Sequence, residues 1–196
     1  MGDAAEDRRK AAELPDGDVV RVLLEQHARI RDLFAEVKTE SGEHKKHAFD
    51  ELRALLAVHE TAEEMVLRPV TSKVDGGQGK QVAEARNQEE SEANEVLKKL
   101  EGLDVTSPEF DTELSSFEKD VDSHAEAEEN QEFPLILAEC DEEQRQTMGK
   151  HILSAEKIAP THPHPSAAGS TTAQYTMGPF ASIIDRTRDA IGSAMS

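Results

Sequence analysis

The sequence predicts an all-α protein, an antiparallel up-and-down four-helix bundle with an additional C-terminal helix and flexible tails. Aromatic residues make up 4% of the 196 residues, Trp is absent, and good helix formers such as Glu, Ala, Leu and Lys dominate. Val, Ile and Thr do not form the alternating runs typical of β-strands. Four long segments instead place apolar residues three and four positions apart, with short breaks between them, as an antiparallel bundle requires.

Each bundle helix has a recognisable start or end. Asp18 can cap the first helix, which ends at Ser41 and Gly42, and the glycines within 76–79 end the second. Pro108 stands at the first position of the fourth helix, where proline is favoured. We therefore expect the bundle helices over residues 18–39, 43–72, 79–101 and about 108–135.

The segments outside the helices differ in composition. Residues 1–16 are charged and Ala-rich, so we expect a flexible leader before the bundle domain, which we place at 17–140. An acidic start predicts an additional helix over 141–158, and Pro, Ser, Ala, Gly and Thr predict a flexible linker over 159–177. Residues 178–196 are expected to form a short amphipathic helix and tail, which could dock on the bundle or bind a protein partner.

Charge and cysteine content narrow the class of protein. With 22 basic and 41 acidic residues the formal net charge is −19, which opposes binding to nucleic acid or to an anionic membrane surface. No apolar run is long enough to cross a bilayer, and the N-terminus lacks an apolar secretory signal. The single cysteine, Cys140, excludes an internal disulfide framework and a thiolate zinc cluster. We expect a cytoplasmic protein.

Six polar side chains stand where the apolar stripes should continue, near the middle of each predicted helix. The second and fourth helices each carry a His and a Glu four residues apart, so that the two side chains project side by side. Because the midpoints of antiparallel helices lie at one level, all six should meet inside the core. They are His27, His59, Glu63, Glu90, His124 and Glu128.

Burying these carboxylates requires either positive charge beside them or their protonation. An unpaired buried carboxylate is costly, and three together repel one another. Two divalent or trivalent cations would offset the cost, because carboxylates bridge such ions and imidazoles bind at either end. The alternative is that the pairs face water at a helix edge, as we expect of the identically spaced His47 and Glu51, which lie off the apolar stripe.

The two halves of the bundle repeat one another. Residues 59–64 and 124–129 share the pattern His-x-x-Ala-Glu-Glu, and a proline follows each histidine by ten residues, at Pro69 and Pro134. The first and third helices also align, with Gln26-His27 over Glu89-Glu90. Two similar hairpins, each supplying one ligand and then a His/Glu pair, would build a pseudo-twofold site that suits two metal ions.

The order of these residues resembles the hemerythrin-like (HHE cation-binding) family. The family pattern is His, then His-x3-Glu, then His or Glu, then a second His-x3-Glu, and the resemblance covers roughly 18–140. It implies a four-helix bundle that holds two iron ions in a non-haem di-iron centre, oxo- or hydroxo-bridged, which reacts with oxygen, peroxide or nitric oxide.

The resemblance also assigns roles to the residues. One half of the centre would use mainly His27, His59 and Glu63, and the other Glu90, His124 and Glu128. Glu63 and Glu128 are the expected bridging carboxylates. One coordination position should stay open for a small ligand, bounded by apolar side chains of adjacent layers, namely Leu24, Leu56, Phe117 and Val121.

The ligand set departs from that of oxygen-carrying hemerythrins, in which five histidines and two carboxylates form the set. Three histidines and three carboxylates favour the ferric state, so redox turnover of peroxide, nitric oxide or O₂ is expected ahead of reversible O₂ binding. A peroxidase-like, catalase-like or nitric-oxide-processing enzyme is therefore one hypothesis. The other is an iron or oxygen sensor that signals to a partner through its C-terminal amphipathic helix.

Several acidic and basic residues are close neighbours of the six in the sequence. Glu89 should point about 100° away from Glu90, and Arg86 could either orient Glu90 or form a surface pair. Three further acids, Glu60, Glu64 and Glu129, are expected on the surface.

Overall fold

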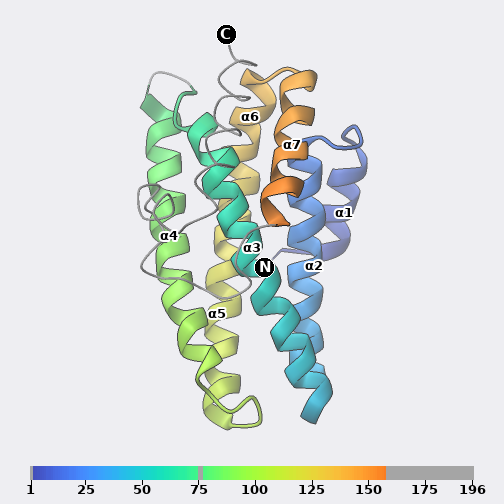
Figure 1. Ribbon diagram of the computed structural model, residues 1–196, viewed down its shortest axis with the longest axis vertical. Coiled ribbons are helices and arrows are strands. Elements are labelled where there is room, and N and C mark those ends of the chain that lie inside the picture. The colour runs from blue at the N-terminus through green and yellow to red at the C-terminus, as the bar shows by residue number, and fades with distance from the viewer. Residues whose placement is uncertain (1, 75–76, 158–196) are drawn as a thin grey trace.

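The computed structural model describes residues 2–74 and 77–157, and over these ranges every regular element is helical (Figure 1). The bundle consists of α2 (Val19–Thr39), α3 (Gly42–Thr71), α4 (Gln78–Glu101) and a fourth arm made of α5 (Pro108–Ala127), a π-helical segment (Glu128–Glu132) and α6 (Phe133–Glu139). Two helices flank it, α1 (Ala4–Ala12) and α7 (Glu142–Glu156). The predicted all-α four-helix bundle with an additional C-terminal helix is confirmed.

Local signals fix the helix ends as expected. The carboxylate of Asp18 accepts the amide hydrogen of Val20, and the Ser107 hydroxyl accepts that of Phe110 with Pro108 in the first turn of α5. Gly42 has a φ of 55°, in the left-handed region that glycine adopts without strain, which permits the tight connection between α2 and α3. None of the helices described is both long and apolar enough to span a bilayer.

The core consists of two apolar halves separated along the bundle axis. One half contains Leu23, Leu67 and Ile136, and the other contains Phe34, Leu97 and further residues of α3 and α5. His27 lies in the sequence between Leu24 of the first half and Ile30 of the second. The residues before and after His59 likewise belong to different apolar halves. The six predicted polar residues therefore form a polar layer where the two halves meet.

The fourth arm is not one α-helix, although the sequence predicts one over about 108–135. The backbone widens into a π-helical segment, Glu128–Glu132, in which the amide of Phe133 donates to the carbonyl of Glu128. Pro134 lacks an amide hydrogen and cannot donate to the preceding turn, so the α-helical ladder is already interrupted there. The segment buries Glu128 and Glu132 completely, and such widened turns are frequent at functional sites.

The N-terminal segment differs from the expected flexible leader over 1–16. It contains α1, which packs along α2 (Figure 1). Asp7 is buried against Arg31, and Lys10 reaches Glu129 at 2.9 Å. The charges that made the segment look solvated are thus satisfied by tertiary ion pairs, which periodicity does not reveal. The predicted linker over 159–177 and the helix over 178–196 lie outside the described residues.

We expect Asp7→Ala to lower the free energy of unfolding by about 1–3 kcal/mol, because it removes a buried carboxylate and leaves Arg31, whose side chain is only 12% exposed, with one partner fewer. Glu6→Ala, one residue earlier on an exposed position, is the matched control and should change stability little. Urea unfolding followed by circular dichroism measures both. Equal stabilities for the two variants would mean that α1 does not hold this contact in solution.

Candidate metal centre

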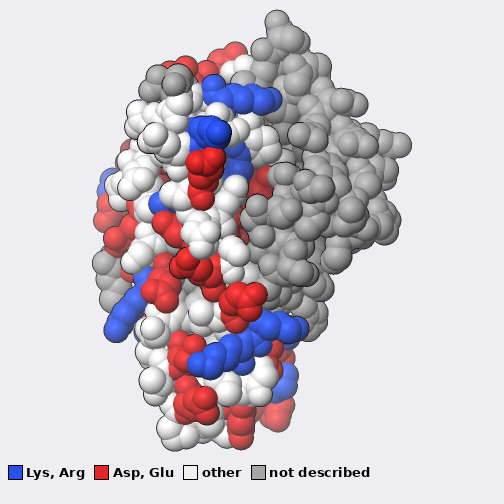
Figure 2. Space-filling view, turned by 90° about the vertical axis from the view of Figure 1, so that its left-hand side faces the viewer, with Lys and Arg blue, Asp and Glu red and all other residues white. Residues whose placement is uncertain are grey.

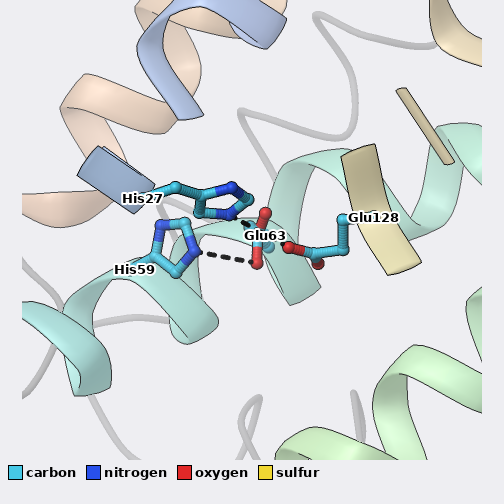
Figure 3. A group of neighbouring side chains, drawn as sticks. All are labelled: His27, His59, Glu63 and Glu128. Atoms are coloured by element: carbon cyan, nitrogen blue, oxygen red, sulfur yellow. Dashed lines mark ion pairs between the residues drawn. The ribbon is translucent and has the colours of Figure 1, made fainter. Parts of the chain in front are cut away.

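The six predicted residues meet in the polar layer. One donor atom from each of four residues lies within 4.8 Å of the others, and this holds for two separate sets. Figure 3 shows the first set with its side chains turned toward one another. The first set is His27, His59, Glu63 and Glu128, and the second is Glu63, Glu90, His124 and Glu128.

Every arm of the bundle contributes to these two sets. His27 comes from α2, Glu90 from α4 and His124 from α5, while α3 and the π-helical segment supply the two shared carboxylates. Glu63 and Glu128 are fully buried, and each of them belongs to both sets. The arrangement therefore offers two adjacent four-residue positions with a pair of carboxylates between them.

Short distances tie the histidines to the carboxylates. His27 Nε2 lies 3.2 Å from Glu128 Oε2, and His124 Nε2 lies 3.2 Å from Glu128 Oε1. His59 Nε2 is 3.5 Å from Glu63 Oε2, along the same helix. In all three histidines, Nε2 is thus the nitrogen that faces Glu63 or Glu128.

The other ring nitrogen of each histidine is held by an outer residue. His59 Nδ1 lies 2.7 Å from Gln26 Oε1, and His124 Nδ1 lies 2.8 Å from Glu89 Oε2. Such contacts fix the tautomer and ring orientation of metal-binding histidines. Gln26 and Glu89 occupy equivalent places in the sequence repeat, each directly before the first ligand candidate of its hairpin and each orienting the histidine of the following helix.

Glu129 orients the third histidine, contrary to its expected place on the surface. Its Oε1 lies 3.3 Å from His27 Nδ1, and its side chain is 6% exposed. Lys10 of α1 and Arg31 of α2 bind the same carboxylate, at 2.9 and 3.2 Å. Burial alone would raise the pKa of Glu129, but these contacts lower it to about 2. Glu129 therefore remains an anion beside His27.

Several neighbouring residues are also buried, which the sequence did not predict. Glu60 and Glu64 are each 6% exposed, and Asn94 donates to Glu60 at 2.8 Å. Arg86 is buried and donates to Glu89 at 2.8 Å, so it supports the residue that orients His124. The expectation that Glu60 and Glu64 lie on the surface was wrong, because α4 packs over the side of α3 that carries them.

Arg68 is the functional residue that the sequence analysis missed. Its buried guanidinium lies among the carboxylates, with Nη2 in contact with Glu63, Glu90 and Glu128. Nη1 donates to Glu132 at 2.6 Å, and Thr71 donates to the other oxygen of Glu132. The excess of buried acids signals that a cation is needed, but the sequence does not show which Arg would supply it.

Buried donor atoms that form no well-aligned hydrogen bond, even where another polar atom is close, test whether the site fits a metal ion. Among the described residues these atoms include one nitrogen each of two histidines and one oxygen each of three glutamates from the two sets. Buried polar atoms of folded proteins are rarely left without a partner, and a bound cation would satisfy these atoms. Carboxylate and imidazole donors together suit iron, manganese or zinc. The atoms are His27 Nε2, His124 Nε2, Glu63 Oε1, Glu90 Oε2 and Glu128 Oε2.

In the metal-free protein, burial and neighbouring charges shift the pKa values of the clustered glutamates and histidines. Burial raises the pKa of Glu63 well above its ordinary value, and the neighbouring Glu128 raises it further. Burial would raise the pKa of Glu128 too, but His124 and Arg68 hold it well below its ordinary value. Burial lowers the pKa of His124, yet the carboxylate of Glu128 outweighs it and holds this pKa well above the ordinary value. Burial and repulsion from His27 lower the pKa of His59 to about 3.

Metal binding is therefore expected to weaken as the pH falls. Glu63, Glu90, His27 and His124 have raised pKa values in the metal-free protein, so they retain protons to higher pH, and a metal ion must displace those protons. Each displaced proton changes the binding constant by about tenfold per pH unit. Calorimetric titration with Fe²⁺ under argon, in two buffers of different ionisation enthalpy, measures the release. A binding constant that stays the same between pH 6 and pH 8 would contradict this assignment.

A cavity of about 550 Å³ adjoins the cluster. Three of the four predicted apolar residues, Leu56, Phe117 and Val121, lie on its wall together with His59 and His124. Leu24 does not line it, because that side chain packs in the other half of the core. The cavity therefore opens from the polar layer toward the half of the bundle that contains Phe34.

The fold and the site together define a four-helix bundle with a buried carboxylate and histidine cluster for cations. Residues 18–136 match the family model described as the hemerythrin HHE cation binding domain, and the chain belongs to that family.

Two relatives illustrate the similarity. An uncharacterized hemerythrin-like protein of Schizosaccharomyces pombe is 31% identical over 134 residues, which cover 68% of this chain and 66% of the relative, just under two thirds of its length. The crystal structure of a hemerythrin HHE cation binding domain-containing protein from Mycobacterium kansasii superposes with a TM-score of 0.61 at 20% identity, covering 85% of this chain and 96% of that one. The second similarity concerns the fold alone.

Proposed function

We propose that the cluster holds two iron ions in a non-haem di-iron centre. His27 and His59 would bind one ion, Glu90 and His124 the other, with Glu63 and Glu128 bridging the pair. The observation that supports this most directly is that two four-residue sets share the same two buried carboxylates. The family membership supports cation binding, and the unpartnered donor atoms lie on these residues.

We propose further that the centre processes O₂, hydrogen peroxide or nitric oxide in a cytoplasmic protein. Iron, when bound, supplies redox chemistry and a coordination position for such ligands. The chain contributes a donor set rich in anionic oxygen, which favours the oxidised ion and thereby turnover over reversible O₂ binding. Arg68 adds a fixed positive charge that limits the net charge of the layer, and Gln26, Glu89 and Glu129 orient the imidazoles.

Metal analysis of His59→Leu tests the assignment. The wild-type protein loaded with Fe²⁺ should retain about two irons per chain, and this variant should lose at least about half of them, because one set loses its imidazole. His47→Leu is the matched control, since His47 has the same spacing to Glu51 but is 77% exposed. Full iron content in His59→Leu, measured by plasma mass spectrometry, would contradict the proposed centre.

Turnover and sensing are separated by a second experiment. The iron-loaded protein should consume hydrogen peroxide or nitric oxide over many cycles when a reductant is supplied, and deleting residues 160–196 should leave this rate unchanged. No turnover, together with a cellular response that disappears on the same deletion, would instead support an iron or oxygen sensor with a protein partner. A stable ferrous–oxygen spectrum over many cycles would support reversible O₂ binding.

A further inference from the structure

The cavity beside the cluster is much larger than the proposed small oxidants need. Its volume is about 550 Å³, whereas a water molecule in the liquid occupies about 30 Å³. Pockets of this size hold organic ligands in other proteins, where the typical range is about 300–1,000 Å³. A ligand that fills the cavity reaches the polar layer, because the inner end of the cavity is formed by His27, His59, Glu90 and His124.

The middle of the cavity is apolar. Its wall comes from α2, α3, α4 and α5, and the contributing side chains offer no hydrogen-bonding groups. A polar ligand such as a sugar would lose its hydrogen bonds with water here without replacement, whereas an alkyl chain would not. The side chains are Ile30, Phe34, Leu56, Val96, Phe117 and Val121.

Charge at the cavity disfavours an anion. The lysine and the arginine on its lining are already engaged: Lys38 donates to both oxygens of Glu118 at 2.6 and 2.8 Å, and Arg31 donates to Asp122 at 2.9 Å. Glu92 and Asp120 add further negative charge to the lining. Acidic side chains are also spread among fewer basic ones on the face of the bundle seen in Figure 2. In the metal-free protein these acids would therefore repel a fatty-acid carboxylate, and they would not repel a neutral molecule.

The inner end offers an acceptor for a hydroxyl group. Glu90 is 1% exposed and lines the cavity, and in the metal-free protein its Oε2 has no hydrogen-bond partner and can accept one from a hydroxyl group. We propose that the cavity binds a neutral alkyl compound that ends in a hydroxyl or hydroperoxyl group. Its alkyl chain would lie along the apolar wall and its O–H end at the polar layer. The proposal adds an organic class of ligand to the small oxidants, and binding itself does not depend on iron.

Binding of a series of primary alkanols from hexanol to tetradecanol to the full-length protein tests the proposal. Each added methylene should tighten binding by about fourfold until the chain fills the cavity, after which the affinity should level off. After metal has been removed with a chelator, decanoate should bind at least about tenfold more weakly than decanol because of the acidic lining. Equal affinity for all chain lengths, or tighter binding of decanoate, would overturn the proposal.

Cavity-filling variants locate the site. Ala93→Phe and Val96→Trp replace small residues on the α4 wall and should abolish decanol binding while preserving the circular dichroism spectrum of the bundle. Ala85→Phe is the matched control, because Ala85 lies exposed on the same helix, and it should bind decanol like the wild type. Unchanged binding in either of the two folded variants would place the ligand elsewhere and overturn the inference.

Measuring iron in the same samples keeps the two proposals separate. A protein that retains about two irons per chain but does not bind alkanols would contradict only the proposed organic ligand. A protein that binds alkanols with the expected dependence on chain length but cannot retain iron would contradict only the proposed di-iron function.

Discussion

Arg68→Leu is expected to destabilise the metal-free protein by about 3–5 kcal/mol, because it removes a guanidinium that contacts four buried carboxylates and leaves them without its charge. Part of this loss should be recovered by metal, since cations bound to the same carboxylates would supply positive charge. The variant should therefore gain more stability from Fe²⁺ than the wild type does. Urea unfolding with chelator and with excess Fe²⁺ under argon measures both effects.

Arg29→Leu is the control for this experiment. Arg29 also contacts two carboxylates, Glu36 and Glu51, but its side chain is 44% exposed, so its removal should change stability little. If the metal-free Arg68→Leu variant unfolds at the same urea concentration as the wild type, the guanidinium does not stabilise the carboxylate layer.

Glu128→Gln is expected to lose most of both ions, because Glu128 belongs to both sets and is fully buried. The substitution preserves the size of the side chain and removes its charge, so Fe²⁺ binding should weaken by at least about 100-fold, more than the loss of an orienting residue. Glu90→Gln, which affects only the second set, should lose less iron. Iron per chain after gel filtration distinguishes the variants. Equal losses in the two, or full iron content in Glu128→Gln, would contradict a bridging role for Glu128.

The parts of the fold that follow from local patterns were predictable. The four apolar stripes gave the bundle, and the polar residues within them identified the layer where the six side chains meet. The α1 segment was missed because Asp7 and Lys10 look solvated until Arg31 and Glu129 are placed beside them. Periodicity reports the apolar face of a helix, and it carries no information about ion pairs between distant segments.

The surroundings of the site depend on tertiary structure. Arg68 follows Glu63 by five residues, and only the packing of α3 against the π-helical segment brings its guanidinium to Glu128 and Glu132. Gln26 was aligned with Glu89 in the repeat, but its bond to a histidine 33 positions away required the helices to be placed. The burial of Glu60, Glu64 and Glu129 likewise depends on which helix covers them.

The central claim is that two cations share Glu63 and Glu128 in the polar layer. Anomalous X-ray diffraction at the iron edge, on crystals grown with Fe²⁺, tests it most directly. We expect two peaks about 3.5–4 Å apart, one beside His27 and His59 and the other beside Glu90 and His124. A single peak, or iron bound outside this layer, would contradict the assignment.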